Sequence, residues 1–117
     1  MIRIELPWPP RSLWPNVAVR EHWTRKAKAL KQYREDASLL CIIQRGPRMT
    51  APISARFTFC PPDQRARDLD NMLAATKAGI DSIAAHIGVD DQHWSMTIAR
   101  GEVRKGGAVV VEIDDPR

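Results

Sequence analysis

The sequence predicts a small α/β (α+β) domain in which one mixed sheet packs with two main helices, in the order β-α-β-α-β-β. Segments 2–6, 53–59, 93–100 and 108–113 are short and rich in apolar residues, and most alternate apolar with polar positions as strands do. Two longer segments between them repeat apolar residues at three- and four-residue spacings, as amphipathic helices do. A length of 117 residues is typical of one domain, so residues 1–117 are predicted to form a single unit.

Prolines dominate the segment after the first strand. Residues 7–16 are PWPPRSLWPN, and prolines are excluded from the interiors of helices and central strands, so an extended, stiff loop is predicted. Residues 19–45 are predicted to form the first helix, which Gly46 and Pro47 end. Its apolar stripe is predicted to consist of Trp23, Ala27, Leu30, Ala37, Leu40 and Cys41.

The second helix is predicted over residues 70–87, with Gly88 as its C-terminal stop. The glycine-containing turn 105–107 separates the last two strands, which are therefore predicted to form a hairpin. The residues of the second helix predicted to face the core are Met72, Leu73, Thr76, Ile80, Ile83, Ala84 and Ile87.

Basic and acidic residues are segregated along this chain, which has a net charge of +4 and a pI near 9.5. Residues 11–34 include seven basic residues and a single acid, Glu21. A solvated helix face usually mixes both signs, so a one-sided face is also typical of contacts to phosphates, and both interpretations remain open. The candidate DNA contacts in this segment are Arg11, Lys26, Lys28 and Lys31.

Composition also bears on location. No apolar run approaches the ~18–20 residues of a membrane span, and the first ten residues lack the pattern of a signal peptide. A cytoplasmic protein without a membrane partner is expected. Cys41 and Cys60 lie in separate apolar contexts, where buried, reduced thiols are expected.

Acidic residues are concentrated between positions 63 and 91. Asp68 and Asp70 open the second predicted helix, where one would cap the backbone and the other would complement the helix dipole. On that helix Asp70, Lys77 and Asp81 fall on one face, which indicates either a surface salt bridge or a lysine beside a metal.

A further acid pair, Asp90 and Asp91, precedes the third strand. These two residues are either turn residues or part of a cluster with the acids of the second helix. Three carboxylates suit a hard cation such as Mg²⁺, which keeps several waters for a phosphate and a nucleophile.

Three motifs carry a resemblance to a known family: LPWPP after the first strand, RDLDN at the start of the second helix, and GVDDQHW before the third strand. In this order and at these separations, across nearly the whole chain, the sequence resembles the RusA-type Holliday-junction resolvases, small nucleases of phage and prophage origin. The resemblance implies a homodimer that binds four-way DNA junctions in recombination and repair. It also implies paired, symmetric nicks made with Mg²⁺, with Mn²⁺ as the alternative ion.

The resemblance assigns roles to individual residues. It implies that Asp68, Asp70 and Asp91 supply the metal site, with Asp90 close by. The family has a lysine one turn after the second Asp, where this chain has Ala74, and the lysine on this helix is Lys77. The basic residue before the first Asp is Arg67, and Arg65 is a further candidate for phosphate contact.

Two other functions remain open on the sequence. A protein that binds junctions without cutting them would share the basic charge, although carboxylates without a cation repel phosphates. DLDN also resembles the motif of aspartate-nucleophile phosphatases, in which the first Asp attacks phosphorus. That motif directly follows a buried strand, whereas here PPDQRAR intervenes.

Overall fold

The computed structural model of this chain describes residues 2–15, 23–44, 48–50 and 52–114. Its elements are β1 (Ile2–Pro7), the 3-10 turn η1 (Arg11–Leu13), α2 (Trp23–Gln44), β2 (Ile53–Cys60), α3 (Leu69–Ala75), α4 (Lys77–Ile87), the 3-10 turn η2 (Asp91–His93), β3 (Trp94–Arg100) and β4 (Ala108–Asp114). The predicted mixed fold and its order are confirmed. Among the described helices, none combines the length and apolarity that a membrane crossing requires.

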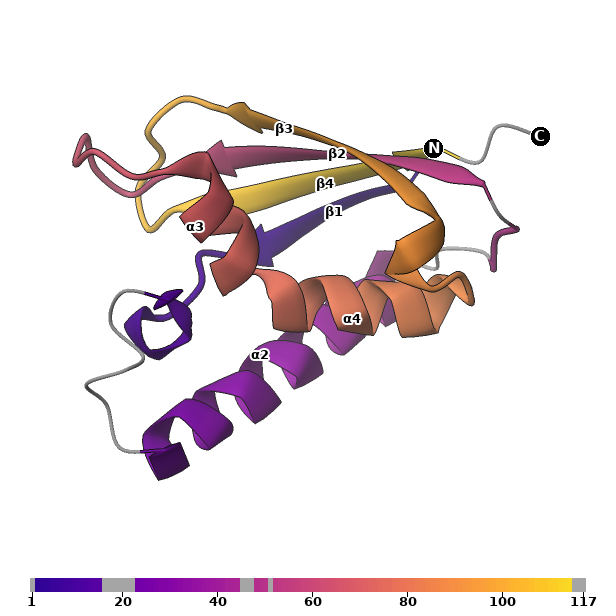
Figure 1. Cartoon of the computed structure of the whole chain (residues 1–117), viewed down its shortest axis with the longest axis horizontal. Helices are drawn as coiled ribbons and strands as arrows, with labels where there is room; N and C mark the ends of the chain where they lie inside the picture. Colours follow the sequence, from indigo (N-terminus) through magenta and orange to yellow (C-terminus); the bar gives the residue numbers. More distant parts are fainter. Residues whose placement is uncertain (1, 16–22, 45–47, 51, 115–117) are drawn as a thin grey trace.

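One four-stranded sheet has the order β1-β4-β2-β3 (Figure 1). β4 runs antiparallel to both of its neighbours, whereas β2 and β3 are parallel. Parallel neighbours need a crossover connection, and α3 and α4 provide it. This crossover starts α3 near the C-terminal ends of β2 and β3 and brings η2 to the opposite end of β3, beside α4.

The predicted hairpin of the last two strands is wrong. β3 is an edge strand beside β2, and β4 lies in the middle of the sheet. The burial explains this order, because Ala108 to Val111 are all buried, as suits a central strand, while most of β3 is exposed or half-buried. The connection 101–107 passes the end of β2, where Gly101 N donates to Phe59 O at 2.8 Å.

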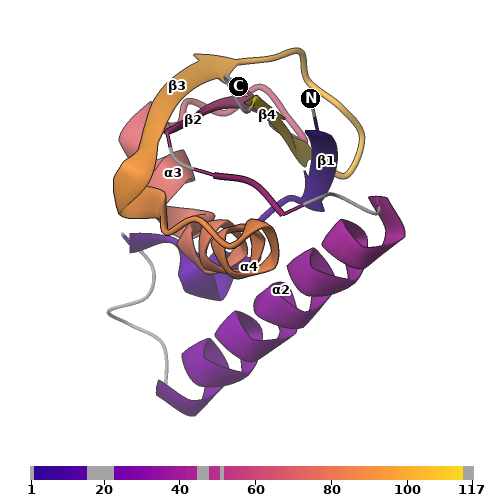
Figure 2. The ribbon, with the colours of Figure 1, turned by 90° about the vertical axis from the view of Figure 1, so that its right-hand side faces the viewer.

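The helices lie on one face of the sheet, where α2 contacts both α4 and the edge strand β1 (Figure 2). The sheet curls over α3 and α4, and α2 runs alongside α4. Alternate residues of the strands point into the core, as predicted for 2–6 and 53–59. The core of the sheet includes Ile4, Leu6, Ile53, Phe57, Phe59, Val109, Val111 and Ile113, against Met72, Ile80, Ile83 and Ile87 of the helices.

The predicted apolar stripe of the first helix is only partly correct. Trp23 is 73% exposed and Ala27 is also exposed, because the first turns of α2 extend beyond the elements it packs on. Burial begins further along, at Ala37 and Cys41, and at Tyr33, which the stripe missed. The Tyr33 hydroxyl donates to Pro7 O at 2.7 Å and ties α2 to the end of β1. The predicted helix limits at 19–22 and 45–47 lie outside the described residues.

The second predicted helix is interrupted at Thr76. The Thr76 hydroxyl donates to Met72 O at 2.8 Å, so the side chain competes for a carbonyl of the preceding turn. Figure 1 shows α3 descending from the sheet and α4 turning to run beneath it. The prediction that Asp70 and Lys77 share one face of a continuous helix is therefore wrong, whereas Gly88 does end α4 in the left-handed conformation, with φ of 79°.

Two smaller predictions concern the proline segment and the thiols. The proline segment is less extended than predicted, because η1 forms between Pro10 and Trp14. Cys41 and Cys60 are buried free thiols, as predicted, and burial raises the pKa of Cys41 to about 11.

Candidate active site

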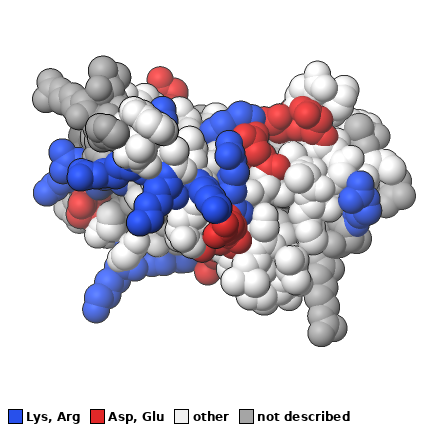
Figure 3. All heavy atoms as spheres, turned by 90° about the horizontal axis from the view of Figure 1, so that it is seen from below, with Lys and Arg blue, Asp and Glu red and all other residues white. Residues whose placement is uncertain are grey.

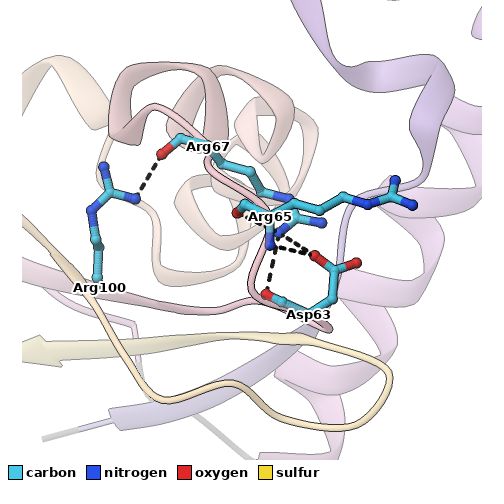
Figure 4. Close-up of polar contacts among 4 residues, drawn as sticks. All are labelled: Asp63, Arg65, Arg67 and Arg100. Atoms are coloured by element: carbon cyan, nitrogen blue, oxygen red, sulfur yellow. Dashed lines mark hydrogen bonds and ion pairs between the residues drawn. The ribbon is translucent and has the colours of Figure 1, made fainter.

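The loop between β2 and α3 is organised by Arg67. Its Nη1 atom lies 2.9 Å from Asp63 Oδ1 and donates to Arg65 O at 3.2 Å (Figure 4). The guanidinium also lies over the Trp8 ring, 5.5 Å from its centroid, within the range of a cation–π contact. Arg67 is therefore fixed on one side by a carboxylate and on the other by an indole.

Arg100 of β3 also contacts this loop. Arg100 Nη1 donates to Arg67 O at 2.6 Å, and the Arg65 backbone N–H donates to Asp63 Oδ1 at 3.0 Å (Figure 4). Two hydrogen bonds lower the pKa of the Asp63 carboxyl below its usual range. The bond from the Arg67 side chain has the larger effect and the bond from the Arg65 backbone the smaller. Asp63 thus stays ionised and holds the loop in the shape that precedes α3.

The loop places Asp68 and Asp70 at the start of α3. Asp68 occupies the N-cap position, and its backbone O accepts from Met72 N at 3.1 Å. Asp68 is therefore the N-cap residue, as predicted, but its side chain makes no capping hydrogen bond. Both carboxylates are exposed, and within the described residues neither has a hydrogen bond or an ion pair. Because residues 61–67 separate β2 from Asp68, the arrangement differs from that of an aspartate nucleophile placed directly after a buried strand.

A cleft of about 610 Å³ opens beside Asp68. Its walls come from the proline segment and from the Arg67 loop, and they combine indole rings with cationic side chains. Its lining includes Trp8, Arg11, Trp14, Arg65, Arg67, Asp68 and Asn71. The structure therefore brings together three of the predicted phosphate contacts, Arg11, Arg65 and Arg67, with one predicted metal ligand.

The remaining predicted acids lie around Lys77, the first residue of α4. Lys77 Nζ lies 2.9 Å from Asp81 Oδ1 and makes a second, shorter contact with Asp91 Oδ2. Asp90 caps η2, since its Oδ1 accepts from Gln92 N at 3.0 Å. Lys77 thus contacts Asp81 of its own helix, which the sequence allowed, and Asp91 of η2, which the sequence did not specify.

This ion pair shifts the pKa of both partners. The hydrogen bond to Asp91, then that to Asp81, raises the pKa of Lys77 above its usual value. The hydrogen bond from Lys77 lowers the pKa of the Asp91 carboxyl. Both groups stay charged across the neutral range, so Asp91 can leave Lys77 only for another cation or for water.

The two groups of acids are separate in this structure. Asp68 directly follows Arg67, whose carbonyl accepts a hydrogen bond from Arg100 at the C-terminal end of β3, whereas Asp91 begins η2, the turn that precedes β3. In the described part of the chain, no three Asp, Glu, His or Cys side chains are grouped closely enough to hold a metal ion. That Asp91 binds the same metal ion as Asp68 and Asp70 stays a prediction. In this structure Asp68 lines the arginine-rich cleft, and Asp91 contacts Lys77.

The basic face of α2 carries the other predicted DNA contacts. Lys26, Lys28 and Lys31 are all exposed, and Figure 3 shows Lys and Arg side chains gathered over the half of this face where α2 begins. Asp and Glu side chains lie beside this cluster. The surface can therefore meet phosphates at several points, although it is not uniformly positive.

Several residues of the site were not predicted from the sequence. Trp8 and Trp14 lie in the proline segment, and two tryptophans among prolines were a signal that something other than a plain loop forms there. Asn71 was visible as the last residue of the RDLDN motif. No local pattern marks Arg100 or Asp63, because their role depends on how β3 meets the loop.

A protein of Xylella fastidiosa strain Temecula1, described as an uncharacterized protein, is 38% identical to this chain over 118 residues. The similarity covers 97% of this chain and 76% of that protein. The chain belongs to the family of this Xylella protein. No protein-family model matches the chain. The relative's description specifies no activity, so a function for the chain has to be argued from its own site.

Proposed function

We propose that this protein is a divalent-metal-dependent endonuclease that resolves four-way DNA junctions by paired, symmetric nicks. The observation that carries the proposal is the pair Asp68 and Asp70, two carboxylates without a partner among the described residues, of which Asp68 lines the arginine-rich cleft. Unpaired acids next to arginines are unfavourable for a simple phosphate-binding surface, and a bound cation removes that conflict. The RusA-type resemblance of RDLDN and GVDDQHW supports the same reaction.

The residues present fit a magnesium ion. Mg²⁺ is commonly held by one or two carboxylates, with waters and substrate phosphates in the remaining positions. Asp68 and Asp70 would hold it, and Asp91, with Asp90 beside it, is the proposed further ligand. When bound, the ion supplies an activated water and stabilises the charge that develops on the leaving oxygen.

The chain's own side chains would hold the DNA and set the geometry. Arg11 and Arg65 are exposed at the cleft and would contact phosphates, while Arg67, fixed by Asp63, would keep the loop in place. Lys77, which contacts Asp91 in this structure, would be the basic side chain beside the proposed further ligand and would stabilise charge on the phosphate. Lys26, Lys28 and Lys31 would contact the arms of the junction.

The proposal includes a homodimer, because a four-way junction has two-fold symmetry and paired nicks need two matching sites. Leu39, Ile42 and Ile43 of α2 are each more than half exposed. Apolar side chains grouped in this way on a surface are a common mark of a protein contact. Within the described part of the chain, we propose this group as the contact with a second copy.

Cleavage of a synthetic four-way junction tests the proposal. The purified protein is expected to cut opposing strands symmetrically with Mg²⁺ or Mn²⁺, and to leave the junction whole in EDTA. A linear duplex of the same sequence is the control and should stay uncut. Binding of the junction with no nicks in either metal would overturn the nuclease proposal.

A second function, junction binding without cleavage, is favoured by one observation. Asp91 is bound by Lys77, and the described acids form no three-residue metal group. In that case Asp70→Asn would leave junction affinity unchanged or higher, and neither metal would produce nicks. The cleavage assay separates the two functions.

A further inference from the structure

The cleft between the proline segment and the Arg67 loop combines features that the cleavage proposal does not use. Trp8 and Trp14 are half-buried and line it together with Asn71. For hydrolysis of a phosphodiester bond, a metal and basic residues suffice, and indole rings add nothing to the chemistry. Their presence beside a predicted metal ligand therefore points to a separate task.

The two rings are held in fixed positions. Trp14 Nε1 donates to Pro9 O at 3.1 Å. In η1, just before Trp14, the Leu13 backbone N–H donates to Pro10 O at 3.0 Å and holds the backbone in place. Trp8 packs against Gly107, where an added Cβ would lie 2.8 Å from Trp8 Cβ. A ring that is already fixed loses little conformational entropy when a ligand stacks on it.

The ring geometry defines where a ligand can lie. The Trp8 and Trp14 centroids are 5.6 Å apart with planes inclined by 39°, so the rings touch each other and no third ring fits between them. Arg67 covers the Trp8 ring. Of the two rings, Trp14 is therefore the one left as a platform for a planar ligand, and the same cleft is lined by Arg11 and Arg65 for an anion and by Asn71 for a polar ring edge.

We propose that this cleft binds one unpaired nucleotide of a DNA strand, with its base on Trp14, its phosphate on Arg11 and Arg65, and its base edge toward Asn71. Aromatic platforms in cationic grooves bind single strands because every base has a π-face and every nucleotide a phosphate. The identification of the ligand as DNA rests on the proposed function. Because Asp68 borders the same cleft, a base held there would bring a neighbouring phosphate toward the acid pair. A base at the branch point of a junction can unstack at low cost, so the cleft would favour branched over linear DNA.

Photocrosslinking of the full chain in EDTA tests this proposal independently of cleavage. A single 5-iodouracil would be placed at the branch point of a four-way junction, in a single strand, or in the middle of a linear duplex. The four tryptophans fall in different tryptic peptides, namely 4–11, 12–20, 21–25 and 78–100. Crosslinks are expected in peptide 12–20 from the junction and the single strand, and far fewer from the duplex. Crosslinks in 21–25 or spread over all four peptides would overturn the proposal.

Binding of the single strand supplies a second measurement. Trp14→Ala is expected to weaken it roughly tenfold, the loss typical of one base–aromatic stack, while Trp23→Ala changes another exposed indole and should have little effect. Equal affinities of the Trp14→Ala variant and the unmodified chain would contradict the proposal. The free nucleotide dAMP should compete only weakly, since the strand also uses neighbouring phosphates, and tight dAMP binding would instead indicate a mononucleotide site. A chain that crosslinks through Trp14 and never cuts the junction would refute the nuclease proposal alone.

Discussion

Two acid groups of this chain have the same chemistry and opposite surroundings. Asp68 and Asp70 open α3 without a side-chain partner among the described residues, and Asp68 borders a cleft lined by arginines and indoles. Asp81 and Asp91 are both bound by Lys77, and Asp90 caps the turn that leads into β3. Asp68 and Asp70 are available to a metal cation, whereas Asp81 and Asp91 already contact the ammonium group of Lys77.

This difference shows how an acid's role depends on its neighbours. The Arg67 loop next to Asp68 uses its own acid, Asp63, to neutralise Arg67, so Asp68 and Asp70 are not needed for that purpose. Asp91, in contrast, would have to give up Lys77 before it could bind a metal. The first group should therefore dominate metal binding and catalysis, and the second should contribute less.

The largest expected effect is on the first group. Asp68→Asn or Asp70→Asn should reduce junction cleavage by more than about 100-fold, the upper end of the loss seen when even an outer partner of a metal ligand is removed. Junction binding should be kept or become tighter, because a negative charge has been removed near the phosphates. Asp114→Asn, an exposed acid at the end of β4, is the matched control. Cleavage that persists in both variants would exclude the first group as the metal site.

A smaller effect is expected within the second group. Asp91→Asn should lower cleavage roughly tenfold, because it removes the proposed further metal ligand. The loss should be smaller than for Asp68 or Asp70, because Asp91 contacts Lys77 in this structure. Asp81→Asn should change cleavage little, since exposed ion pairs contribute less than about 1 kcal/mol. Single-turnover cleavage rates measure both variants. Equal losses for Asp81 and Asp91 would indicate that they serve only to hold Lys77.

Thr76 joins the two groups, and its hydroxyl is buried against Met72 O. Thr76→Val keeps the branched shape and removes this hydrogen bond, so the free energy of unfolding should fall by about 1 kcal/mol. Urea denaturation measures it, with Thr97→Val on the exposed side of β3 as the control. A variant as stable as the unmodified chain would show that another interaction sets the break between α3 and α4.

The smallest expected effect is the pH dependence of the Lys77 ion pair. Because the pKa of Asp91 is lowered in the folded protein, its stabilisation is present above the ordinary Asp pKa of about 3.9 and is lost as the pH falls below it. The raised pKa of Lys77 has the opposite sense, so its stabilisation is lost as the pH rises above about 10.4.

Lys77→Met should therefore destabilise the protein by less than about 1 kcal/mol near pH 6, since Lys77 is largely exposed, and by less still near pH 3. Urea unfolding at the two pH values measures the difference, with Lys105→Met in the turn before β4 as the control. A cost that is the same at both pH values would mean that the charge pair is not its source.

Local patterns were sufficient to predict much of the fold. The alternation in β1 and β2 gave their buried faces correctly, and Gly88 was correctly identified as the end of a helix. Strand order was not predictable in the same way, because the turn 105–107 suggests a hairpin while the apolar content of both faces of β4 favours a central position. The break at Thr76 also escaped prediction, since a threonine on an apolar helix face looks like any other core residue.

The candidate site was predicted residue by residue and not as an arrangement. The sequence placed Asp68, Asp70, Arg65 and Arg67 together because they are neighbours in the chain. It could not show that Lys77 binds Asp91, since this contact depends on how η2 returns along α4. The indole walls of the cleft depend on the contact between the proline segment and the Arg67 loop, which no single segment encodes.

The unpaired acids of α3, and not those around Lys77, are expected to bind the metal first. Titration of the ¹⁵N-labelled chain with Mn²⁺ tests it most directly, because this ion broadens the amide signals of residues close to it. We expect signals of residues 68–71 to broaden at the lowest Mn²⁺ concentrations, before those of residues 90–94. Earlier broadening at residues 90–94, or equal broadening throughout the chain, would contradict it.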